Sequence, residues 1–142
     1  MITLNEMTRP LTSNTVTEGI RVRAVAIYQP NESKPEVNRF FFAYRVTMVN
    51  EGTETAQLLS RHWIIIDGDG DREDVEGTGV VGKFPLLEPG DVFEYTSFCP
   101  LNTEWGTMEG TYRMQRDDGT KFDVVIGRFY LTMNAPREVE AA

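Results

Sequence analysis

Short stretches with strand-like patterns, separated by turn residues, run through most of this chain. In Ile20–Tyr28, apolar residues at alternate positions flank Arg21 and Arg23, and this period of two predicts a strand. The same reasoning, with β-branched and aromatic residues, predicts strands over Phe40–Asn50, Ala56–Asp67 and residues 92–98, 110–115 and 121–131. The Asp-Gly pair at residues 118–119 predicts a hairpin between the last two.

No segment sustains helical apolar spacing with caps at its ends. Short strands with turns at intervals of roughly ten residues predict an all-β fold, an immunoglobulin or fibronectin type III-like antiparallel β-sandwich of about seven strands. A small barrel is the alternative closure. For a chain of 142 residues we expect an N-terminal arm over residues 1–16, one domain over 17–133 and a flexible C-terminal tail over 134–142.

The charge of the chain limits its partners. Twenty-two Asp and Glu against 14 Lys and Arg give a net charge of -8, which repels nucleic acid and anionic lipid. The first ten residues do not resemble a signal peptide, and no apolar run approaches the ~18 residues of a membrane span. Cys99 is the only cysteine, so the chain cannot form an internal disulfide. We expect a cytoplasmic protein that binds neither nucleic acid nor membrane and needs no cofactor.

The stretch GTGVVG places Gly77, Gly79 and Gly82 at the spacing of a dinucleotide-binding motif. Such a motif works when its glycines open a helix whose amides face a pyrophosphate. Two prolines between residues 83 and 90 oppose a helix here, and acids at residues 73, 74 and 76 would repel phosphate. The residues favour a structural loop or edge strand, with nucleotide polyphosphate or pyrophosphate binding as the alternative.

Around this motif the chain resembles the ApaG domain family. The resemblance is carried, in order along the chain, by residues 41–52 (FFAYRVTMVNEG), 57–67 (QLLSRHWIIID), 77–82 (GTGVVG), 85–90 (PLLEPG), 93–101 (FEYTSFCPL) and 106–114 (GTMEGTYRM). It implies a fibronectin type III-like sandwich and a small stand-alone bacterial protein, often encoded beside a diadenosine tetraphosphate hydrolase. It also implies an association with cobalt resistance and magnesium efflux.

In eukaryotes, similar domains are appended to F-box proteins and to a polymerase-delta-interacting protein, where they look like protein-binding modules. The family supplies no accepted catalytic residues to carry over. This chain departs from the family pattern at Phe84, where Gln is usual, at Phe98, where Gly is usual, and at Trp105, near which Pro is common. Gly127 also stands where a Pro is usual.

Six acids lie between residues 67 and 76, and Asp67, Asp69 and Asp71 imitate the start of a calcium loop. Arg72 and Thr78 replace the Gly and the bidentate Glu that such a loop requires. We expect a solvated hairpin tip, and keep the three aspartates as candidate ligands for a divalent cation.

The remaining candidates lie on the strand predicted over Ala56–Asp67. His62, the only histidine, is two residues from Ser60, but side chains at that spacing are roughly 7 Å apart, too far for a catalytic pair. We expect His62 instead to be hydrogen-bonded to a neighbour, and Cys99 to be a small buried residue of the core. Trp63 is expected in the core, and Arg61 is expected either to lie on an aromatic ring or to meet an anionic ligand or partner.

The aromatic residues Phe84, Phe98 and Trp105 are expected in loops, where exposed rings often anchor a protein partner. Burial at the end of the core is the alternative for these rings. The sequence therefore predicts a non-catalytic sandwich that acts through its surface on a protein partner, with a homodimer through edge strands as a further expectation.

Overall fold

Nine β-strands and two three-residue 3-10 helices make up the described part of the chain, residues 11–134 of a computed structural model. The strands are β1 (Thr12–Thr17), β2 (Ile20–Tyr28), β3 (Phe40–Asn50), β4 (Ala56–Asp67), β5 (Arg72–Thr78), β6 (Leu86–Leu87), β7 (Val92–Leu101), β8 (Trp105–Arg116) and β9 (Lys121–Thr132). The 3-10 helices η1 (Pro30–Glu32) and η2 (Pro35–Val37) lie in the connection between β2 and β3. The all-β prediction is confirmed.

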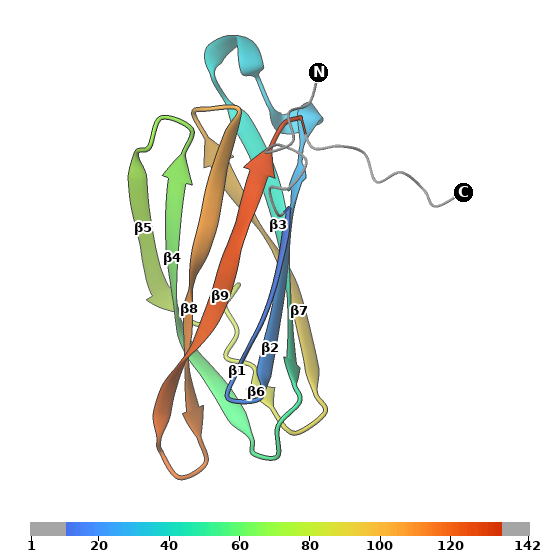
Figure 1. The fold of residues 1–142 in the computed structure, drawn as a ribbon, viewed down its shortest axis with the longest axis vertical. Coiled ribbons are helices and arrows are strands. Elements are labelled where there is room, and N and C mark those ends of the chain that lie inside the picture. Colours follow the sequence, from blue (N-terminus) through green and yellow to red (C-terminus); the bar gives the residue numbers. More distant parts are fainter. Residues whose placement is uncertain (1–10, 135–142) are drawn as a thin grey trace, which may run out of the picture.

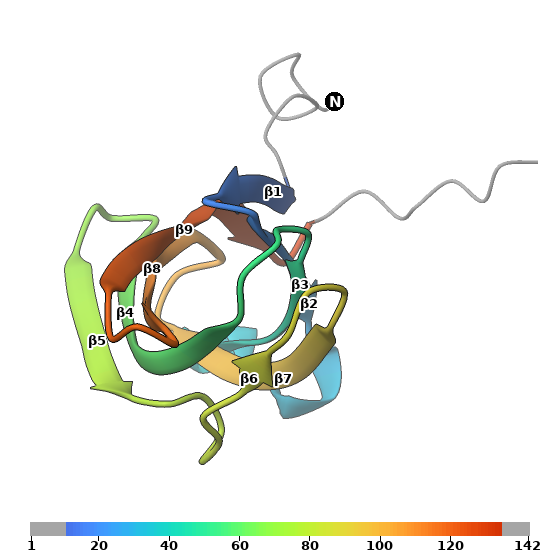
Figure 2. The ribbon, with the colours of Figure 1, turned by 90° about the horizontal axis from the view of Figure 1, so that it is seen from below.

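The strands form two antiparallel sheets that face each other (Figure 1). One sheet has the order β1-β2-β3-β7, and the other has the order β5-β4-β8-β9, with β6 paired to one end of β4. We call them the β7 sheet and the β5 sheet. Seen from below, the chain leaves β5, pairs briefly as β6 and crosses to β7 (Figure 2). The predicted sandwich is confirmed, with nine strands rather than about seven.

Three of the nine strands were not predicted from the sequence. Thr12–Thr17 falls largely within the predicted arm, because its residues TSNTVT are mostly polar. Arg72–Thr78 falls largely within residues 67–76, which were predicted to form a solvated hairpin tip, so that tip is shorter than expected. Leu86–Leu87 has only two residues. The other parts of the predicted arm and tail, residues 1–10 and 135–142, lie outside the described residues.

The core fills the space between the inward faces of the two sheets. Trp63, predicted to be core, is 2% exposed and makes edge contacts with the rings of Tyr112 and Phe129 at centroid distances of 6.2 and 6.0 Å. Tyr44 of the opposite sheet reaches the same indole at 5.2 Å. The contact between Trp63 and Tyr44 connects the two sheets, so it packs β4 against the opposite sheet.

Side-chain hydrogen bonds join the two sheets along β1 and β9. Thr15 Oγ1 donates to the carbonyl of Val125 at 2.8 Å, and the amide of Val125 donates to Thr17 Oγ1 at 3.1 Å. On the opposite side of the molecule, β5 and β7 are the outer strands of their sheets. Within residues 11–134 no helix is long and apolar enough to cross a membrane.

Candidate functional site

The glycine motif runs from the end of β5 into a tight turn, without a helix after it. The amide of Gly79 donates to the carbonyl of Leu59 at 2.9 Å, and Val80 and Lys83 exchange backbone hydrogen bonds of 2.9 and 2.8 Å. The prediction that no helix follows Gly82 is confirmed. A phosphate site needs amides that are free to donate, and three amides of this loop already donate to protein carbonyls.

Each of the three glycines has a local reason to be glycine. At Gly77, a Cβ would lie 2.8 Å from both terminal nitrogens of Arg61. At Gly79, φ is +62° and a Cβ would lie 2.5 Å from the carbonyl oxygen of Lys83. At Gly82, φ is +76°, a conformation that favours glycine. The motif is therefore explained by backbone geometry.

Val81 lies at the tip of this turn with a φ of +44°. Positive φ at both Val81 and Gly82 is the pattern of a type I′ turn, where Asn-Gly is the preferred pair. A β-branched residue in this region is unusual, and strained positions are often associated with function. Because the side chain of Val81 is 51% exposed, no core contact accounts for its presence at this position.

Residues 80–86, which we call the 80–86 loop, carry further exposed apolar side chains. Phe84 is 50% exposed and Leu86 is 54% exposed, so together with Val81 they present three large apolar groups to solvent. The loop is held from both ends by Val80 and Leu87, which are buried in the core. Phe84 was predicted from the sequence as a partner-binding residue; Val81 and Leu86 were not.

The backbone of the 80–86 loop is fixed to β4. The amide of Leu58 donates to the carbonyl of Pro85 at 3.0 Å, and Gln57 Nε2 donates to the carbonyl of Phe84 at 3.3 Å. Leu87 then pairs with Ala56 in the β5 sheet. The loop is thus presented as an ordered surface, so a partner would have little ordering entropy to overcome on binding.

Arg61 stabilises the loop from the inward side. Its Nη1 donates to the carbonyls of Thr78 and Gly79 at 3.0 and 2.9 Å, and its guanidinium lies over Gly77. The structure brings together Arg61 and Gly77, two residues that were predicted as candidates for a ligand or partner surface. The contacts that Arg61 makes here are with other residues of the chain. The hydrogen bonds of Arg61 support a structural role for its side chain.

His62 points to the outer face of the β5 sheet, towards acids on β5. Its Nε2 lies 2.8 Å from Asp74 Oδ2, and its Nδ1 lies 3.6 Å from Glu76. Arg72 also donates to Asp74, at 2.7 Å, and this bond, followed by the contact with His62, holds the pKa of Asp74 well below its ordinary value. The predicted hydrogen bond of His62 to a neighbour is confirmed.

A shallow hollow beside His62 on this outer face is bordered by charges that pair with one another. Arg113 donates to Asp123 at 3.1 Å across β8 and β9. Ser60 and Glu76 also border the hollow. Exposed pairs of this kind contribute little to stability, and they leave the hollow without a strong field for an anion.

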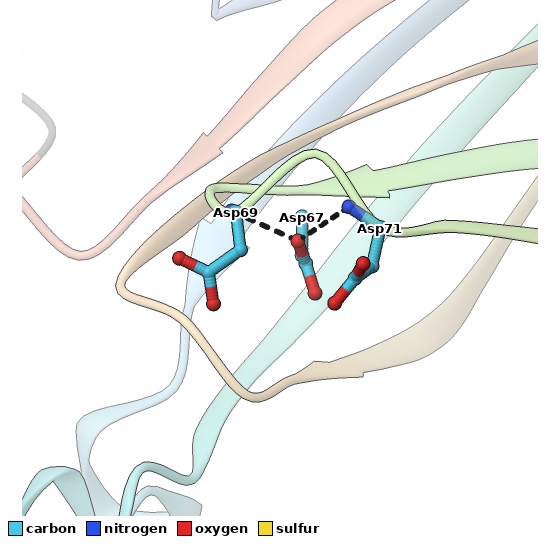
Figure 3. Close-up of side chains that lie close together, drawn as sticks. All are labelled: Asp67, Asp69 and Asp71. Atoms are coloured by element: carbon cyan, nitrogen blue, oxygen red, sulfur yellow. Dashed lines mark hydrogen bonds between the residues drawn. The ribbon is translucent and has the colours of Figure 1, made fainter.

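The three candidate metal ligands lie close together at the turn between β4 and β5 (Figure 3). One carboxylate oxygen from each of Asp67, Asp69 and Asp71 lies within 4.8 Å of the others. Asp67 Oδ1 accepts hydrogen bonds from the amides of Asp69 and Asp71, at 2.9 and 3.0 Å. These hydrogen bonds give Asp67 a role in stabilising the turn. A cation site at this turn stays a prediction.

Phe98 and Trp105, which were grouped with the loop aromatic residues, belong to strands. For Phe98 the other expectation, the strand predicted over residues 92–98, is the correct one. Phe98 lies in β7, which continues to Leu101 because its last residues pair with the aromatic start of β3. Trp105 is the first residue of β8 and pairs with Thr132 of β9. Phe98 is 57% exposed and stacks on Phe41 at 5.4 Å. Trp105 is half-buried and stacks on a tyrosine of β9, so it is less available to a partner than Phe84 or Phe98.

The nucleophilic groups of the core are buried and protonated at neutral pH. Cys99 is 3% exposed, as the sequence predicted, and burial raises the pKa of its thiol to about 12. The hydroxyls of Tyr95 and Tyr112 bond to each other, and burial raises the pKa of both. A protonated, inaccessible thiol is a poor nucleophile, so these buried groups have a structural role.

Comparison with known proteins identifies the family. Residues 30–116 match the family described as the ApaG domain. A "Protein ApaG" from Anaeromyxobacter dehalogenans (strain 2CP-C) is 55% identical over 121 residues, covering 85% of this chain and 95% of that protein. One from Brucella abortus (strain S19) is 47% identical over 122 residues, covering 86% of this chain and 94% of that protein.

A solved structure has the same fold. The crystal structure named for the ApaA protein of Bordetella pertussis superposes with a TM-score of 0.80 at 43% identity, covering 90% of this chain and 98% of that one. The fold, the family match and the full-length relatives agree with the resemblance read from the sequence. The chain therefore belongs to the ApaG domain family.

Proposed function

We propose that this protein is a non-catalytic β-sandwich that binds a protein partner through the 80–86 loop. The observation that carries the proposal is the display of Val81, Phe84 and Leu86, each about half exposed, on a backbone fixed by hydrogen bonds. Exposed apolar side chains that gather on one ordered segment are typical of protein interaction sites.

The strain at Val81 supports the same proposal. Asn or Gly would adopt this backbone more easily, so a valine at the tip is better explained by what its side chain contacts outside the molecule. The exposed side chain of Val81 adds apolar area to the 80–86 loop without contributing to the core.

The partner's expected chemistry follows from the loop and from the net charge. An apolar groove would accept the ring of Phe84, since aromatic anchors in pockets carry much of the binding energy at protein interfaces. A basic rim around that groove would suit a chain with a net charge of -8.

A non-catalytic role fits the side chains that could have supplied chemistry. His62 is engaged with Asp74, and Cys99 is buried with a raised thiol pKa. Both groups have structural explanations, whereas the exposed side chains of the 80–86 loop do not.

We propose that this interaction acts in divalent-cation homeostasis, the role that the family resemblance implies. The proposal predicts that a strain lacking the protein is sensitive to cobalt and is rescued by the parent but not by Phe84→Ala. A variant with Asp67, Asp69 and Asp71 all changed to Asn separates the two routes. Its rescue would assign the role to the partner surface, and its failure would assign it to direct cation binding at the turn.

Site-specific photo-crosslinking tests the partner surface. A photoreactive amino acid at Val81 or Leu86 should yield a discrete crosslinked protein in cells, identified by mass spectrometry. The matched control is the same amino acid at Val125, an exposed valine on β9. Equal crosslinking to the same proteins from both surfaces would rule out the 80–86 loop as the binding site.

A further inference from the structure

The outer edge of β7 is a ten-residue strand edge whose pairing is left open. Within residues 11–134, β7 (Val92–Leu101) pairs with β3 on one side, and no strand lies on its other side. An unprotected edge of ten residues is a template for a further strand.

The other outer strands are protected in ways that β7 is not. On β5, Glu73, Asp74 and Glu76 would place like charges against any identical strand. Along β1 and β9, the hydroxyls of Thr15 and Thr17 hydrogen-bond to the backbone of Val125, so each of these two outer strands covers the edge of the other. The outward side of β7 carries a single charge, Glu94, which lies 3.5 Å from Arg45.

The backbone orientation of β7 follows from its first contact with β3. The amide of Asn50 donates to the carbonyl of Asp91, so Asp91 faces β3 and alternate residues after it do the same. The backbone groups of Val92, Glu94, Thr96 and Phe98 therefore point to the open edge. Residue 100 is the next in this series and is a proline, which lacks the amide that would otherwise be exposed.

We propose that the open edge of β7 pairs antiparallel with β7 of a second copy of the chain, forming a continuous eight-stranded sheet across a twofold axis. In this pairing Val92 lies opposite the partner's Phe98, and Glu94 lies opposite the partner's Thr96. This inference goes beyond the proposed function and does not depend on the 80–86 loop.

The order of side chains on the strand favours a second copy over an unrelated segment. Four residues have backbone groups that face the open edge, and their side chains are in order apolar, polar, polar and apolar. The strand is therefore complementary to a second copy of itself that runs in the opposite direction. Val92 and Phe98, at 61% and 57% exposed, would each bury the other.

Neighbouring registers are less favourable. A shift of two residues in one direction would place Glu94 against the partner's Glu94, a like-charge pair. A shift in the other direction would place Val92 opposite the partner's Pro100, which has no amide to donate. The proposed register avoids both.

Sedimentation equilibrium of the full chain between micromolar and millimolar concentration tests the dimer. We expect the parent to dimerise, and Thr96→Glu to weaken dimerisation roughly tenfold, because it creates two like-charge pairs with Glu94. Thr96→Lys should strengthen dimerisation, because it creates two opposite-charge pairs. Thr120→Glu and Thr120→Lys, in the turn between β8 and β9, are the matched controls for net charge.

The outcomes separate this inference from the loop proposal. Dimerisation that responds to Thr96 but not to Thr120 or Phe84 supports it. A parent that stays monomeric throughout would overturn it and leave the edge to an extended segment of another protein. A dimer weakened by Phe84→Ala and unaffected by Thr96 would also overturn it, because the copies would then meet through the loop.

Discussion

At the scale of single residues, Val81 is the position where local stability and the proposed binding role oppose each other. Its φ of +44° costs roughly 1–2 kcal/mol for a side chain of this kind. We expect Val81→Asn to raise the free energy of unfolding by about 1 kcal/mol, because it creates the Asn-Gly pair that a type I′ turn prefers.

Urea unfolding of the purified variant measures this change. Val125→Asn is the matched control, because it removes the same side chain from a strand, where valine is favoured, and it should destabilise the protein. A loss of stability in both variants would show that Val81 is not strained.

The sequence predicted the residue-scale features that depend on local chemistry. Cys99 in the core, His62 hydrogen-bonded to a neighbour and glycine-shaped backbone at residues 77–82 all follow from residue type and spacing. The exposure of Val81 and Leu86 could not be predicted, because it depends on which side of the loop faces β4.

At the scale of elements, the pairing of β4 with β8 depends on a glycine where the two strands lie close together, at Gly110 opposite Trp63. A Cβ at Gly110 would clash with the carbonyl oxygen of His62. We expect Gly110→Ala to destabilise the protein by about 3 kcal/mol, because the two strands must separate to admit the methyl group. Thermal unfolding measures it as a lower Tm.

Gly52→Ala is the matched control, since a Cβ there would approach no atom closer than 3.4 Å. It should lower the free energy of unfolding by less than about 1 kcal/mol. Equal losses in the two variants would mean that the paired strands β4 and β8 tolerate a methyl group at residue 110. The close approach of Gly110 to His62 would then not require glycine.

The element-scale predictions succeeded where a strand carries an apolar face and failed for β1 and β5, two edge strands with mostly polar residues. β2, β3 and β4 were predicted to the residue, because each carries a long apolar face that packs in the core. β1 and β5 form through pairing with a neighbour and carry mostly polar residues, so their sequences lack the apolar alternation that indicates a strand.

At the scale of the whole molecule, the stability of the fold is sensitive to alkaline pH, because a thiol and two tyrosine hydroxyls are buried in the core. Burial raises the pKa of Cys99 from 9.0 to about 12, and it also raises the pKa values of Tyr95 and Tyr112 above their ordinary value of 10.0. A raised pKa in the folded state stabilises the fold fully below the unfolded value, and this contribution is lost as the pH rises towards the folded value.

We therefore expect the free energy of unfolding to fall as the pH rises from 9 towards 12, measured by urea unfolding at a series of pH values. Cys99→Ala should delay the start of this fall to about pH 10, where the tyrosines begin to contribute. A free energy that stays constant up to pH 11 would contradict the buried, protonated state of these groups.

We propose that the exposed side chains of the 80–86 loop bind a protein partner. The dissociation constant of the crosslinked partner, measured with purified proteins, tests this proposal. We predict that Phe84→Ala raises it at least about tenfold with little change in Tm, while Val125→Ala leaves it unchanged. Equal dissociation constants for the parent and Phe84→Ala, with both proteins folded, would contradict the proposal.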